Sequence, residues 1–133
     1  MSSYKRIMLL ANTNDMVMQG LCAKAVFFSE RCKSIMLLLS VIICDKSDFE
    51  KRSILYKKSH LLLKYYGKRF VVPSEDQIIA CSETLVPCLI SQVKKNKIDL
   101  LLVDKSIDLQ SVISEFSCDV MFLESDRAEL VQL

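Results

Sequence analysis

The chain has 133 residues, of which 51% are apolar and 26% charged. A chain of this length can bury a core of its own without a metal ion or a disulfide. Lys and Arg number 18 against 16 Asp and Glu, a formal net charge of +2, which is too small to indicate a nucleic-acid or membrane partner. We therefore expect a single domain, residues 1–133.

The apolar runs indicate the cellular location of the protein, and that location indicates the state of its cysteines. The longest apolar run, Ile35 to Cys44, is far shorter than the ~18 residues that span a bilayer. The first five residues lack the charged start and apolar run of a signal peptide, so we expect a cytoplasmic protein. Its cysteines should then be free thiols, mostly packed as small apolar residues. They are Cys22, Cys32, Cys44, Cys81, Cys88 and Cys118.

The first half of the chain predicts a strand, a helix, a strand and a second helix. Tyr4 to Ala11 is a short apolar run that turn-forming residues end, which indicates a buried strand. From Asp15 to Cys32 apolar residues recur every three or four positions, which predicts an amphipathic helix with Asn14 as its N-cap. The unbroken run from Ile35 to Cys44 is typical of a central parallel strand. Asp48 to Tyr66 predicts a surface helix that ends before Gly67.

The second half continues the alternation. Two segments, RFVV (69–72) and QIIAC (77–81), could each form the third strand, and we favour QIIAC. A helix from Leu85 to about Asn96, capped by Thr84, follows, then a strand at 100–103, a short helix at 109–116 and a last strand at 120–123. Such alternation predicts an α/β fold with a doubly wound, mainly parallel sheet and helices on both faces.

In such folds ligands bind outside the carboxyl ends of the strands, and the loops there carry little recognisable chemistry. Gly20 and Gly67 are the only glycines, so the glycine-rich loops of dinucleotide sites and P-loops are absent. His60 is the only histidine and has no metal-ligand neighbours in the sequence. No G-x-S-x-G motif occurs. We expect neither an enzyme nor a metal site.

Asp104, at the end of LLLVD, could be read as the phosphate acceptor of a receiver domain. The loop after the first strand lacks the paired carboxylates that would hold Mg²⁺. Only 29 residues follow Asp104 (to Leu133), too few for the remaining elements of a receiver. We do not favour this reading.

Three segments resemble universal stress proteins: YKRIMLLANTND with the following helix and the strand SIMLLLSVII, then LISQVKKNKIDLLLVDKS, and finally CDVMFLES. In the second, Asp99 stands where the family has an acidic residue before its penultimate strand. The resemblance covers most of the chain, although 48–81 matches only in pattern. It implies the strand order 3-2-1-4-5.

The chain departs from the family at the nucleotide site. Nucleotide-binding members carry Asp after the first strand and a G-x-x-G-x9-G-[ST] loop after the fourth. Here Asn12 takes the place of the Asp, and Asp104 to Ile107 contains no glycine. Glycines let backbone amides approach phosphate oxygens closely. The resemblance therefore implies the branch that does not bind ATP: small cytoplasmic stress-response proteins, usually dimeric, with no established catalytic step.

Our leading interpretation is a non-enzymatic, homodimeric interaction or signalling protein without a cofactor. The alternative is a nucleotide or small-anion binding module that uses Asn12, Thr13, Lys105 and Ser106. These four residues equally suit plain turns, a solvated loop and a helix cap.

The last strand is the candidate dimer interface. An edge strand exposes unpaired N–H and C=O groups that must be covered, blunted or paired. Val120, Met121, Phe122 and Leu123 carry no charge or proline to blunt the edge. We expect two copies of this strand to pair about a two-fold axis, with the tail at Leu130, Val131 and Leu133 packing over the seam. The other reading is a monomer whose tail covers its own edge.

Overall fold

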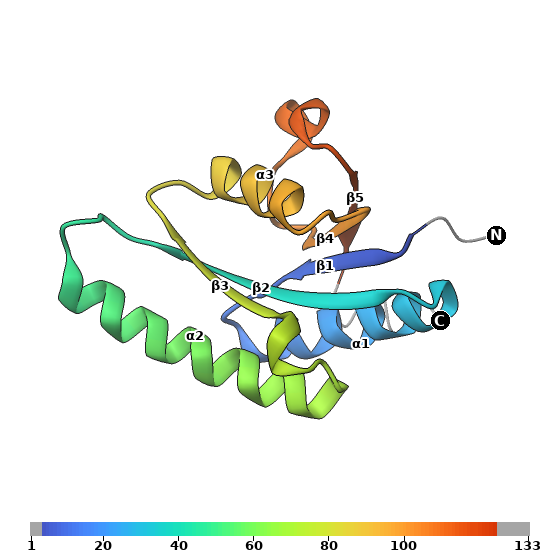
Figure 1. Cartoon of the computed structure of the whole chain (residues 1–133), viewed down its shortest axis with the longest axis horizontal. Helices are drawn as coiled ribbons and strands as arrows, with labels where there is room; N and C mark the ends of the chain where they lie inside the picture. The colour runs from blue at the N-terminus through green and yellow to red at the C-terminus, as the bar shows by residue number, and fades with distance from the viewer. Residues whose placement is uncertain (1–3, 125–133) are drawn as a thin grey trace.

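The computed structural model describes residues 4–124, which form one parallel sheet in the order β3-β2-β1-β4-β5 (Figure 1). This is the predicted topology. The strands are β1 Arg6–Leu10, β2 Ile35–Ile43, β3 Gln77–Ser82, β4 Leu100–Asp104 and β5 Asp119–Leu123. The helices are α1 Asp15–Cys32, α2 Phe49–Phe70 and α3 Leu85–Lys95, with short 3-10 helices η1 Ser74–Asp76 and η2 Gln110–Glu115.

The central strand β1 explains why the first apolar run does not alternate. Residue Ile7 lies opposite Met36 of β2 on one side and Leu100 of β4 on the other. Its neighbours Met8 and Leu9 are fully buried because helices cover both faces of the sheet. A strand buried on both faces must be apolar at every position, which is the pattern of the sequence.

Two cores flank the sheet. On one face α1 and α2 pack over β1 and β2, with Leu21, Leu63 and Tyr66 at the centre. On the other face α3 and η2 contribute Leu89, Val93 and others to a second cluster. Figure 1 shows α1 and α2 on one side of the sheet and α3 with η2 on the other. The predicted arrangement, helices on both faces, is confirmed.

Helix α1 begins and ends as the sequence predicts. Asn14 is its N-cap, and the Asn14 side chain accepts a hydrogen bond from the Val17 N–H at 3.1 Å. Lys33 ends the helix with a left-handed backbone, φ 54°. Asp15 lies in the first turn, where a negative charge suits the helix dipole.

Helix α2 runs further than predicted. It does not end at Gly67 but continues to Phe70, and Val71 takes the left-handed conformation that ends it, φ 59°. Gly67 is needed for a different reason: a Cβ built there would clash with the Gln77 side-chain amide and lie 2.9 Å from the Val72 carbonyl oxygen. The glycine thus allows the chain that leaves α2 to cross close to the helix.

The choice between the two candidate third strands is settled by this extension. RFVV (69–72) supplies the last residues of α2 and its C-cap, while QIIAC lies in β3 and pairs with β2. Helix α3 begins after Thr84 and ends before Asn96 as predicted, although the Thr84 side chain makes no capping hydrogen bond. The short helix expected at 109–116 is the 3-10 helix η2.

Asp99 joins the amino ends of β1 and β4. Its Oδ2 accepts hydrogen bonds from the Lys5 and Arg6 backbone N–H groups, each at 2.9 Å. Hydrogen bonds to a charged acceptor are the stronger kind. The acidic residue before β4 is therefore a structural clamp on the start of β1.

All six cysteines lie in the described part of the chain as free thiols, with Cys22, Cys44 and Cys88 buried and Cys81 exposed. Burial raises the pKa of the Cys22 thiol to about 12. No helix within residues 4–124 combines the length and the apolar content that crossing a bilayer requires.

We predict that Gly67→Ala destabilises the protein. An alanine inside a helix usually stabilises by about 1 kcal/mol relative to glycine, but here the Cβ would overlap Gln77 and crowd the Val72 carbonyl. We expect a net loss of about 1–3 kcal/mol in the free energy of unfolding, measured by urea titration. In a Gln77→Ala background the loss should shrink without vanishing, because the Val72 oxygen belongs to the backbone. A stabilising Gly67→Ala would contradict this packing.

We predict six titratable thiols in denaturant without reductant. In the native protein at pH 8, Cys81 should be alkylated first, since it is exposed. Cys22 should react last, because it is buried and its raised pKa leaves little of the reactive thiolate. Mass spectrometry of timed alkylation gives the order. Fewer than six thiols, or early reaction of Cys22, would contradict it.

Candidate functional site

The loops after β1 and β4 lie side by side at the carboxyl edge of the sheet. The two strands pair in parallel, with Leu9 opposite Leu102. Asn12 and Thr13 follow the carboxyl end of β1, and Lys105 and Ser106 follow the carboxyl end of β4. The fold therefore brings the four predicted residues to one edge, where ligands bind in folds of this type.

In the loop after β1 the polar groups bind one another. The Asn12 Oδ1 accepts the Asn14 N–H at 2.8 Å, and the Asn14 side chain in turn caps α1 through Val17. The Asn12 N–H points at the Met18 sulfur, 3.4 Å away. Asn12 thus forms the turn that leads into α1, and Thr13 is exposed.

In the loop after β4 an internal carboxylate binds the nearest donors. The Asp104 Oδ2 accepts the Ser106 N–H at 3.1 Å and the Ser106 hydroxyl at close range. The Ile107 N–H donates to the Asp104 carbonyl at 3.0 Å, and the Lys105 N–H donates to the Leu123 carbonyl at 2.8 Å. The backbone amides of residues 105–107 are therefore already bonded within the protein.

The Lys105 ammonium is also paired. Its Nζ lies 3.3 Å from Glu124 Oε1, although 66% of the side chain is exposed. An exposed pair of this kind contributes little to stability. It does offset part of the positive charge that an anion would require.

A second interaction beneath this edge was not predicted from the sequence. The Tyr66 hydroxyl of α2 donates to the Asp15 carboxylate at the start of α1. Burial, together with the Asp15 carboxylate, raises the pKa of Tyr66, so the hydroxyl stays protonated. Periodicity marked Tyr66 only as the end of a helix, and no local signal linked it to Asp15.

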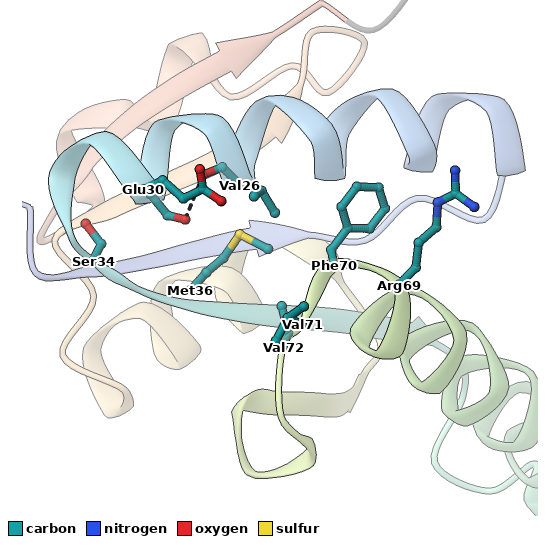
Figure 2. Close-up of a pocket in the computed structure, with 9 residues that line it drawn as sticks. Val26, Glu30, Ser34, Met36, Arg69, Phe70, Val71 and Val72 are labelled. Carbon is teal, nitrogen blue, oxygen red and sulfur yellow. Dashed lines mark hydrogen bonds between the residues drawn. The ribbon is translucent and has the colours of Figure 1, made fainter.

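A separate cavity lies toward the amino end of β2. It measures about 400 Å³ and lies between the C-terminal parts of α1 and α2. Figure 2 shows Val26, Met36 and Phe70 at its centre, with Glu30 and Arg69 at opposite ends. It lies near the amino ends of the strands, whereas Asn12 and Lys105 follow the carboxyl ends of β1 and β4.

The serine hydroxyls of this cavity are engaged with the backbone. Ser29 donates to the Val26 carbonyl at 3.1 Å, and Ser34 donates to the Tyr4 carbonyl at 2.6 Å. The Arg69 guanidinium lies 5.7 Å from the centre of the Phe70 ring. What remains for a ligand is an apolar floor and two solvent-exposed charged ends.

A third depression, about 330 Å³, lies at the carboxyl end of β2 beside Asp45, Lys51 and Glu83. The Asp45 carboxylate accepts the Ser47 N–H and hydroxyl, which lowers the pKa of Asp45. Among residues 4–124 no three His, Cys, Asp or Glu side chains come together as metal ligands would.

The residues predicted for the dimer, Val120 to Leu123, form most of β5 at one edge of the sheet. All four are half-buried. Met121 and Leu123 pack toward the α1 side, and Val120 and Phe122 toward the α3 side. Within residues 4–124 β5 pairs with β4 alone. The tail residues Leu130, Val131 and Leu133 lie outside the described residues.

Comparison with known proteins gave no matching family model and no matching curated protein. Solved structures do match. A universal stress protein family member from Burkholderia pseudomallei superposes with a TM-score of 0.70 and 11% identity, over 90% of this chain and 96% of that one. The universal stress protein from Archaeoglobus fulgidus gives 0.67 and 8%, over 91% and 94%. This chain has the universal stress protein fold.

Two of the matching structures contain nucleotides. One is a universal stress protein in complex with cAMP, with a TM-score of 0.65 and 12% identity over 94% of this chain and all of the other. Another is a universal stress protein family protein from Arabidopsis thaliana with AMP bound, at 0.63 and 15% over 94% of each chain. At these identities the similarity establishes the fold alone, because proteins with the same fold can bind different ligands.

Proposed function

We propose that this chain is a non-enzymatic cytoplasmic interaction module of the stress response, which works as a homodimer and does not bind ATP. The observation that supports the absence of ATP binding is the hydrogen bonding of Asp104. Its carboxylate accepts the Ser106 N–H and hydroxyl, which are donors in the loop after β4. The assignment to stress physiology rests on the shared fold.

An internal carboxylate at this point opposes phosphate in two ways. It uses the local hydrogen-bond donors, and its negative charge repels a second anion. A phosphate would have to displace Asp104 and then find amides to replace those already bonded in residues 105–107. Without a glycine in this loop, the backbone has no position free of a Cβ for a close approach.

Nucleotide or small-anion binding is the second candidate, and the cAMP and AMP complexes with the same fold favour it. Asn12, Thr13, Lys105 and Ser106 would then form the site. Lys105 would leave Glu124 to meet the phosphate, and Thr13 would add a hydroxyl. The adjacency of the β1 and β4 loops is compatible with this arrangement.

We predict no saturable binding of ATP, ADP, AMP or cAMP tighter than about 100 μM, equivalent to about 5.5 kcal/mol, by isothermal titration calorimetry. Binding that Lys105→Ala abolishes would instead support the second candidate. The control is Lys97→Ala, which replaces an exposed lysine just before the amino end of β4. This substitution should leave nucleotide binding unchanged in either case.

The dimer proposal rests on the outer edge of β5, which pairs with no second strand within residues 4–124. The Asp119 N–H donates to Asp99 and the Leu123 carbonyl accepts from Lys105, so these two residues face β4. Because successive residues of a strand face opposite sides, the N–H groups of Val120 and Phe122 face away from β4. A second β5 could accept them across a two-fold axis.

We predict that light scattering after size exclusion reports twice the chain mass, and that Phe122→Pro shifts it toward the monomer by removing one edge donor. Cys81→Pro in β3, the edge strand on the opposite side of the sheet, is the matched control. The Ser82 carbonyl accepts from Cys44 and so faces β2, which means that the N–H of the preceding residue, Cys81, faces away from β2. This substitution should leave the dimer intact, with circular dichroism verifying both folds. A wild-type monomer at tens of micromolar would refute the dimer, and an unaffected Phe122→Pro dimer would refute its location.

A further inference from the structure

Helix α2 carries far more positive charge than the rest of the molecule. The helix holds seven Lys and Arg against one Glu, a net +6, while the whole chain is +2. The other residues together are therefore at −4. The basic residues are Lys51, Arg52, Lys57, Lys58, Lys64, Lys68 and Arg69.

Exposed apolar side chains lie in the middle of this charge. Ile54, Leu61 and Tyr65 are 56%, 65% and 56% exposed. Their spacing of seven and then four residues places them on one stripe of the helix, opposite the buried residues Leu63 and Tyr66. From Ile54 to Tyr65 the stripe runs about 16 Å.

The lysines border the stripe on both sides. Lys57, Lys64 and Lys68 repeat with the same spacing of seven and four residues, so they form a parallel row one step around the helix from the apolar stripe. Lys58 lies on the other side. Within residues 4–124 no carboxylate lies in ion-pair range of these four lysines. Their charge is thus available to a partner.

The shape and chemistry of this face restrict its partner. In Figure 1 α2 lies at the margin of the molecule, with one side against the sheet and the other outward. A second copy of the same face would meet it with like charge. Phosphates and bases of a nucleic acid would satisfy the lysines but leave Ile54 and Leu61 against polar groups. A bilayer with anionic headgroups satisfies both, since acyl chains accept the apolar stripe and headgroups the lysines.

We propose that the outer face of α2 (Ile54, Leu61 and Tyr65 with Lys57, Lys58, Lys64 and Lys68) docks on anionic lipid surfaces. The helix lies in the plane of the interface and does not cross it. Ile54, Leu61 and Tyr65 enter the boundary between headgroups and acyl chains, and the flanking lysines pair with lipid phosphates and carboxylates. This surface is separate from the carboxyl edge of the sheet and independent of nucleotide binding.

The test is co-sedimentation of the full chain with vesicles of phosphatidylcholine containing about 30% phosphatidylserine. We expect binding to these vesicles, little binding to pure phosphatidylcholine, and loss of binding as salt rises to about 0.5 M. Lys57→Gln/Lys64→Gln/Lys68→Gln should weaken partitioning about tenfold or more. Ile54→Ser/Leu61→Ser should weaken it by about tenfold without changing its salt dependence.

Matched controls distinguish binding through this face from a general effect of positive charge or of exposed apolar side chains. Lys94→Gln/Lys95→Gln/Lys97→Gln removes the same charge at the end of α3, and Met16→Ser removes a side chain that is 73% exposed on α1. Both should bind vesicles as the wild type does. Every variant changes exposed residues, so circular dichroism should show unchanged folding.

Three outcomes would overturn the proposal. One is no binding to anionic vesicles, and another is an equal loss in the α3 triple variant. The third is binding to an acidic peptide or to single-stranded RNA, lost in the α2 variants, without any vesicle binding. That last result would assign the face to a different class of partner.

Discussion

The burial of β1 on both faces is the constraint on which the rest of the structure depends. Each of its inner residues must fit between two helical layers while its backbone pairs with β2 and β4. Its parallel pairing with β4 places the loops that follow the two strands at the same end of the sheet. The Asp99 carboxylate joins the amino ends of the same two strands.

Much of the fold followed from the sequence because apolar runs and helical spacing are local signals. The run from Ile35 to Cys44 and the cap at Asn14 were identified correctly for this reason. The end of α2 differs from the prediction, because a glycine near the end of a helical pattern is a local stop signal whereas Gly67 lies inside the helix. Its role depends on Gln77 and Val72, which reach it only after the chain has turned back, and no short window of sequence contains that information.

The candidate site was only partly predictable, for a related reason. The sequence placed Asn12, Thr13, Lys105 and Ser106 after two strands, and the topology makes those strands neighbours. The hydrogen bonds that occupy these residues depend on loop conformation. Asp104 was considered as a phosphate acceptor, whereas the structure makes it an acceptor of hydrogen bonds from Ser106. Similarly, the net charge of +2 conceals the concentration of positive charge on α2.

The hydrogen bond between Tyr66 and Asp15 gives the layer of α1 and α2 a mechanical property. The ring of Tyr66 is 1% exposed, and its hydroxyl ties the second half of α2 to the first turn of α1. Sliding α2 along the sheet would break this tie and hydrate a buried aromatic ring. The position of α2 on the sheet is therefore coupled to the first turn of α1, which the turn at Asn12 precedes.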